Sequence, residues 1–171
     1  RLEAEVPLDA QSLQLTASSG AGGPMARTTI QAFASRGSTP VDPLVLPLGT
    51  TAVVADPHEI ANVLGSDGVH WLLDASENLQ LEVYFMAPSC VPASPFESPR
   101  RALTPGDLEA LMRRSRVLGL AEMMNFPGVV NGLPSELEKL QLEGAGHVDG
   151  HAPGLLGKGL QAYAASGIRS D

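Results

Sequence analysis

Glu122 is the residue whose type and position in this chain best suit chemistry. It follows residues 117–121, a short apolar run that is typical of a strand buried on both faces of a parallel sheet. Folds with parallel sheets place their reactive groups at the carboxyl ends of such strands. A glutamate is also commonly a solvated loop residue, so its type alone leaves both interpretations open.

Polar groups also lie at or near the ends of three other predicted strands. They are Asp56 and His58 after residues 50–55, Ser89 and Cys90 after residues 81–86, and Asp149 and His151 within residues 147–151. Because the ends of parallel strands meet at one edge of a sheet, we expect these groups to gather near Glu122. Carboxylate and imidazole groups on neighbouring strands are suitable ligands for Zn, Mn or Fe.

Each of these groups also has a purely structural interpretation. His58 could cap the helix that follows it, and His151 could hydrogen-bond its own loop. Cys90 is of a type that is more often a small buried apolar residue than a nucleophile. Spacing alone therefore predicts a site without specifying its reaction.

Strand and helix signals alternate from residue 43 onward. We predict strands over 50–55, 81–86, 117–121 and 147–151, and helices over 67–78, 105–115, 134–144 and 157–166, with a helical turn over 60–64. This order implies right-handed βαβ units, hence an α/β fold and a partial (β/α)8 (TIM-like) barrel of about four βα units. A doubly wound open sheet is the alternative, although no glycine-rich dinucleotide loop follows a first strand.

The chain divides by composition into two predicted parts. Residues 1–42 are mostly small and polar, with a little β-structure expected near the start, and form an irregular segment. Residues 43–171 form the predicted barrel domain. The net charge of −8 argues against nucleic-acid binding, and no apolar run approaches the length of a membrane span. A single cysteine and no secretory signal favour the cytoplasm.

Four segments resemble the adenine deaminases of the amidohydrolase superfamily. They are GTTAVVADPHEIANVLG at 49–65, SCVPA at 89–93, GLAEMM with FPGV at 119–129, and DGHAPG at 149–154. The resemblance covers about residues 38–171. It implies a metal-dependent (β/α)8 barrel that hydrolyses the purine base adenine to hypoxanthine and ammonia. It also implies a pair of divalent ions, Mn or Fe with Zn as an alternative, that activate water.

The same resemblance implies roles for individual residues. Glu122 matches the family's metal-bridging glutamate and is expected to be both a metal ligand and a catalytic residue. His151 matches a metal-ligand histidine, and His58 is expected to be catalytic. The purine base is expected to contact Glu59, Ser89 and Cys90.

Other family residues are missing from this sequence. The family's His-x-His pair would fall near residues 33–38, but no histidine precedes His58, and its Asp-His-Glu motif would begin where the sequence ends. We therefore expect a truncated chain that is inactive alone. The alternatives are a catalytically dead fragment that serves as a binding or assembly partner, including of its own copies, and an unrelated regulatory or nucleotide-binding α/β domain.

Overall fold

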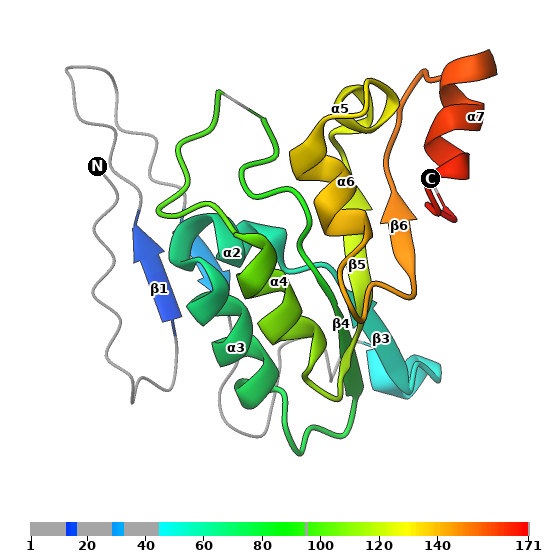
Figure 1. Ribbon diagram of the computed structural model, residues 1–171. Coiled ribbons are helices and arrows are strands. Elements are labelled where there is room, and N and C mark those ends of the chain that lie inside the picture. Colours follow the sequence, from blue (N-terminus) through cyan, green and yellow to red (C-terminus); the bar gives the residue numbers. More distant parts are fainter. Residues whose placement is uncertain (1–12, 17–28, 33–44, 95, 171) are drawn as a thin grey trace. The chain divides into compact units, whose positions relative to one another are not determined.

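The computed structural model describes residues 13–16, 29–32, 45–94 and 96–170 (Figure 1). Its contacts define two compact units. The first holds the described residues up to Val53 together with His70–Val83, and the second holds residues 54–69 and 84–170. All the candidate site residues belong to the second unit, so the site is described within it.

Four strands form a sheet whose spatial order follows the sequence order. They are β3 (Ala52–Ala55), β4 (Glu82–Ala87), β5 (Val117–Met123) and β6 (Val148–Gly150). β4 pairs with β5, and β5 with β6, in parallel. Sequential parallel strands with helices between them are the arrangement of a (β/α) barrel. The prediction of an α/β fold with a partial TIM-like barrel is therefore confirmed.

Helices follow the strands at nearly all the predicted positions. They are α2 (His58–Leu64), α3 (Ser66–Ala75), α4 (Pro105–Met112), α5 (Phe126–Val130), α6 (Pro134–Leu140) and α7 (Gly157–Ala165), preceded by the 3-10 helix η1 (Leu46–Leu48). The short helix α5 was not predicted. Within the described ranges, no helix is long and apolar enough to cross a membrane.

The described residues of the N-terminal segment form a two-stranded hairpin. β1 (Leu13–Thr16) pairs antiparallel with β2 (Thr29–Ala32). The rest of residues 1–42, including the stretch 33–38 that corresponds to the family's His-x-His pair, lies outside the described residues. The boundary between an irregular part at 1–42 and a barrel domain at 43–171 stays a prediction.

Helix α4 and strand β5 form much of the core of the second unit. Leu108 and Leu111 on α4 are fully buried, as is Leu120 on β5. Met112 on the same helix is only half-buried. Burial of such leucine side chains contributes about 1.5–3 kcal/mol each, so this contact fixes the strand that carries Glu122.

The amino end of α4 is held by a carboxylate at its first turn. The backbone N–H of Asp107 donates to Thr104 Oγ1 (3.2 Å) and its Oδ2 accepts from the backbone N–H of Thr104 (2.9 Å), which completes a capping box. Arg101 lies 2.9 Å from the other carboxylate oxygen, which also accepts from the hydroxyl of Ser66. Partial burial opposes ionisation, but the hydrogen bonds from Thr104 and Arg101 outweigh it and lower the pKa of Asp107 to about 2.

We expect Asp107→Asn to lower the free energy of unfolding by about 1–2 kcal/mol at neutral pH, as for other lost helix caps. Because folding lowers this pKa from 3.8 to about 2, the contribution is present above about pH 4 and disappears as the pH falls toward 2. Urea unfolding of both proteins across this pH range measures it. The control is Glu109→Gln on the same helix, whose pair with Arg113 is a surface contact at 3.6 Å. Equal urea midpoints for Asp107→Asn and the native chain at pH 7 would contradict the prediction.

Candidate functional site

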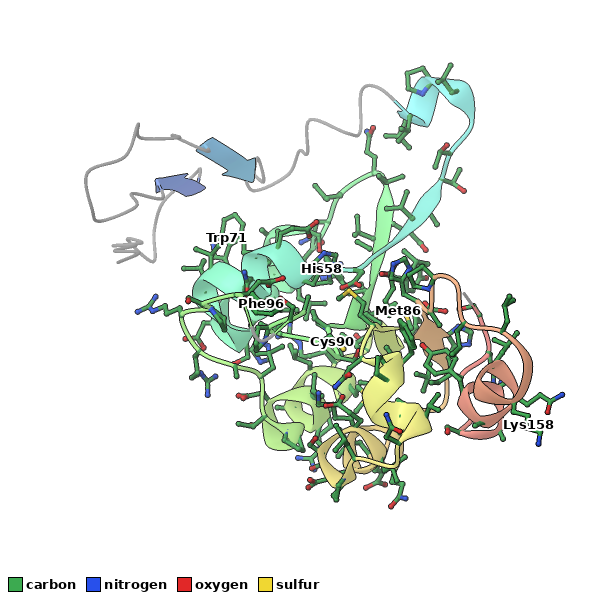
Figure 2. All side chains as sticks on the ribbon, turned by 90° about the horizontal axis from the view of Figure 1, so that it is seen from above. His58, Trp71, Met86, Cys90, Phe96 and Lys158 are labelled. Atoms are coloured by element: carbon green, nitrogen blue, oxygen red, sulfur yellow. The ribbon has the colours of Figure 1, made fainter. Side chains whose placement is uncertain are left out.

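The carboxyl end of β3 brings an aspartate and a histidine together. Asp56 directly follows the strand, and His58, labelled in Figure 2, is the first residue of α2. Asp56 Oδ2 lies 3.2 Å from His58 Nδ1, and His58 Nε2 lies 3.4 Å from Glu59 Oε1. The first contact lacks the alignment of a hydrogen bond. His58 Nδ1 and the other Asp56 oxygen, Oδ1, are buried and find no hydrogen-bond partner among the described residues.

The charges around Asp56 link this strand end to Glu122. Burial raises the pKa of Asp56 above its usual value, and the neighbouring His58 opposes that increase. The carboxylates of Glu122 and Glu59 raise the pKa of Asp56 further. Carboxylates that share a site in this way are stabilised by a cation placed between them.

Glu122 is the penultimate residue of strand β5 and is half-buried. The Ser89 hydroxyl, from the segment that follows β4, donates a 2.7 Å hydrogen bond to the backbone carbonyl of Glu122. The backbone N–H of Met124 donates to the same carbonyl at 2.9 Å, so the chain turns immediately after Glu122. The two predicted site residues Ser89 and Glu122 are thus in direct contact.

Cys90 lies in the core of this region. Its side chain is 4% exposed, and its Sγ is 3.5 Å from Ser89 Oγ and 4.0 Å from Met123 Sδ. This burial agrees with the apolar interpretation of Cys90. The proposed contact of Ser89 and Cys90 with a purine stays a prediction.

His151 follows β6 directly. In the β5–β6 pairing Met123 lies opposite Gly150. Glu122 directly precedes Met123 and His151 directly follows Gly150, so both residues are next to this pair. In Figure 1, β5 and β6 run side by side in the same direction. The imidazole of His151 is exposed, whereas its backbone N–H donates to the hydroxyl of Tyr163 at 3.1 Å.

The chemistry of these donors fits a divalent cation, although their number does not complete a site. Carboxylate oxygens and imidazole nitrogens are the ligands that such cations take. Asp56 Oδ1 and His58 Nδ1, which have no hydrogen-bond partner among the described residues, could also serve as ligand atoms. Among the residues that the structure describes, no group of three or more His, Cys, Asp or Glu is arranged to hold a metal ion.

Two contributors to this region were not assigned a role from the sequence. Asp56 was recognised only as a strand-end residue, and the Asp-Pro that ends the β-branched run is the signal that marks it. Tyr163 lies on α7 and donates to the carbonyl of Met123, 40 residues earlier in the chain, so no local sequence pattern predicts that contact.

The chain is similar in sequence to curated adenine deaminases. It is 57% identical to the adenine deaminase of Syntrophobacter fumaroxidans over 126 residues, which are 74% of this chain and 22% of the relative. It is 56% identical to the adenine deaminase of Archaeoglobus fulgidus over 128 residues, 75% of this chain and 23% of the relative. Adenine deaminase 1 of Rhizobium meliloti is 50% identical over 130 residues, 76% of this chain and 23% of the relative.

No protein-family model matches the chain. The chain spans less than a quarter of the length of these curated relatives, yet the aligned part makes up about three quarters of the chain itself. Identity of 50–57% over at least 126 residues leaves no doubt about common ancestry. Together with the partial barrel and its polar strand ends, it assigns this chain to the adenine deaminase family, as a partial chain.

Proposed function

We propose that this chain forms part of the site at which adenine is hydrolysed to hypoxanthine and ammonia. The observation that carries the proposal is the pair of Asp56 and His58, 3.2 Å apart at the carboxyl end of β3, together with the effect of the Glu122 charge at the end of β5 on Asp56. The names of the similar proteins supply the substrate. Deamination of a purine needs an activated water and a group that carries protons, and this cluster has residues of both kinds.

Each residue has a proposed role. Glu122 and His151 would hold a divalent cation, Mn or Fe with Zn as an alternative, in a binuclear centre. When bound, the cation supplies Lewis-acid activation of water. The Glu122 carboxylate can accept a proton from the water and pass it to the purine ring or the leaving amine.

His58 and Glu59 act beside it. Asp56 Oδ2 lies 3.2 Å from His58 Nδ1, so the two side chains can act together, and we propose that the imidazole of His58 transfers a proton during catalysis. The Glu59 side chain is 65% exposed, so it can meet a purine directly. Ser89 and Cys90 are buried, and we propose that they contact the purine base from below its site, where Ser89 also binds the backbone carbonyl of Glu122.

We propose further that these 171 residues need additional protein for catalysis. No His-x-His pair occurs anywhere in the sequence, although the resemblance implies one for the metal centre. Assembly with a complete subunit is the second candidate role. Leu118 and Val54 on the strands are 46% and 59% exposed, and exposed apolar strand residues favour association.

Two experiments test the proposed function. Titration of the chain with Mn²⁺ should show weak binding, which the double variant Glu122→Ala/His151→Ala loses. Residues 43–171 should also be grafted in place of the matching part of the Archaeoglobus fulgidus adenine deaminase. We expect the graft to release ammonia and hypoxanthine in equal amounts from adenine with Mn²⁺ or Fe²⁺, and the 171-residue chain alone to release none.

The outcomes separate the parts of the proposal. A graft that folds and binds metal but leaves adenine intact would contradict the substrate. Equal Mn²⁺ binding by the chain and the double variant would contradict the ligands. Turnover by the chain alone would contradict the need for additional protein.

A further inference from the structure

The end of strand β5 is held by two side-chain hydroxyls. Ser89 Oγ donates to the backbone carbonyl of Glu122 at 2.7 Å, and Tyr163 Oη donates to the next carbonyl, that of Met123, at 2.6 Å. Both donor residues are 2% exposed. The two hydroxyls come from different elements, one from the segment after β4 and the other from α7.

The sheet ladder is irregular where these hydroxyls bind. Leu120 pairs with Val148 and Met123 with Gly150, so three steps along β5 match two steps along β6. A bulge of this kind leaves backbone groups outside the regular ladder, and a buried carbonyl without a partner is costly. The hydroxyls of Ser89 and Tyr163 bond the carbonyls of two successive residues, Glu122 and Met123, and the Glu122 carbonyl also accepts from the backbone N–H of Met124.

Tyr163 also ties β5 to β6. Its hydroxyl accepts a 3.1 Å hydrogen bond from the backbone N–H of His151 while it donates to Met123, and a hydroxyl can do both. The ring packs over Gly150, where an added Cβ would lie 3.0 Å from Tyr163 Cε1. Figure 1 shows α7 beside β6, and Lys158 of the same helix points away from the strands in Figure 2.

We propose that Ser89 and Tyr163 are positioning residues that hold the backbones of Glu122 and His151 so that the two side chains can share one divalent cation. The inference rests on the proposed function, because it assumes that these two residues are ligands. In this role both hydroxyls act through the backbone carbonyls that they bind. Groups that orient metal ligands typically contribute 10- to 100-fold to metal affinity.

The test compares Ser89→Ala, Tyr163→Phe and their double variant with the native full chain. Co²⁺ is the probe, because its visible absorption reports both affinity and ligand geometry. We expect each single variant to bind Co²⁺ roughly 10-fold more weakly, with an altered spectrum, and the double variant to lose up to roughly 100-fold. Ser166→Ala is the matched control, since the hydroxyl of this C-cap residue donates to the Ala162 carbonyl of the helix that it follows.

Hydrogen exchange of the metal-free chain gives a second readout. Tyr163→Phe removes the acceptor of the His151 amide, so that amide should exchange at least about 10-fold faster, while Ser166→Ala leaves it unchanged. Thermal unfolding of each metal-free variant identifies a temperature at which all of them are folded. Co²⁺ is titrated at that temperature, so that a loss of binding does not reflect unfolding.

The results distinguish three cases. If the native chain binds no Co²⁺, the proposed function fails, and unchanged exchange at His151 would then overturn the positioning role too. If the native chain binds Co²⁺ and folded Ser89→Ala and Tyr163→Phe bind it equally well, the hydroxyls are merely structural and the inference is wrong. Weakened binding with the expected change in exchange supports it.

Discussion

Replacing Glu122 with Gln is expected to lower adenine deamination by the grafted enzyme by roughly 10²–10⁴-fold, the range that a positioned proton-transfer group contributes. The amide has nearly the shape of the carboxylate but cannot accept a proton or neutralise a cation. The same change should weaken Mn²⁺ binding by the 171-residue chain. Ammonia release measures the first effect, and metal titration measures the second.

Glu138→Gln is the matched control for this substitution. Glu138 lies on α6 in the same unit, with an exposed side chain, and the substitution changes the net charge by the same amount. We expect the control to keep its activity and its metal affinity. If both glutamine variants lose activity equally, net charge rather than the position of Glu122 would explain the loss.

The strands and most helices could be predicted because their signals are local. The β-branched run of β3 and the apolar run of β5 are bounded by glycine, proline or polar residues. Thr104 is a residue type that favours the N-cap position, and it precedes α4. The helix α5 escaped prediction because it has only five residues and contains Pro127 and Gly128, which usually interrupt helices. Its signal was Asn125, whose side chain accepts from the N–H of Gly128 at 3.1 Å.

The site was predictable only to the level of strand ends. The sequence shows that Asp56, Ser89 and Glu122 each follow an apolar run, and parallel pairing places such residues at one edge. Which of them touch depends on register. The bulge between Leu120 and Met123 shifts the end of β5 against β6, and no local pattern marks that shift.

Burial could not be predicted from residue type either. Ser89 is a polar residue with 2% exposure, which is compatible with folding only because its hydroxyl finds the Glu122 carbonyl. Glu136 is similarly buried, and its carboxylate pairs with Lys139 Nζ at 3.0 Å. In both cases a partner supplied by the fold decides where the side chain lies.

Gly119→Ala is expected to have the largest effect on stability among the substitutions considered. An added Cβ would collide with the backbone carbonyl oxygen of His147, which is also the acceptor of the Leu120 N–H at 2.9 Å. A backbone atom cannot rotate away as a side chain can, so β5 and β6 must separate at this point. We expect a loss of about 2–4 kcal/mol, from about 1–3 kcal/mol for overpacking and about 1 kcal/mol for the weakened hydrogen bond.

Urea unfolding of the metal-free chain measures this loss, and Gly146→Ala is its control. Gly146 lies in the loop before β6, and an added Cβ there meets no heavy atom within 4 Å. That substitution should change the free energy of unfolding by no more than about 0.5 kcal/mol. A Gly119→Ala midpoint equal to that of the control would mean that β5 and β6 are not held at this spacing. Because β5 carries Glu122 and β6 ends directly before His151, Gly119→Ala should also weaken Mn²⁺ binding at temperatures where the variant is folded, whereas Gly146→Ala should not.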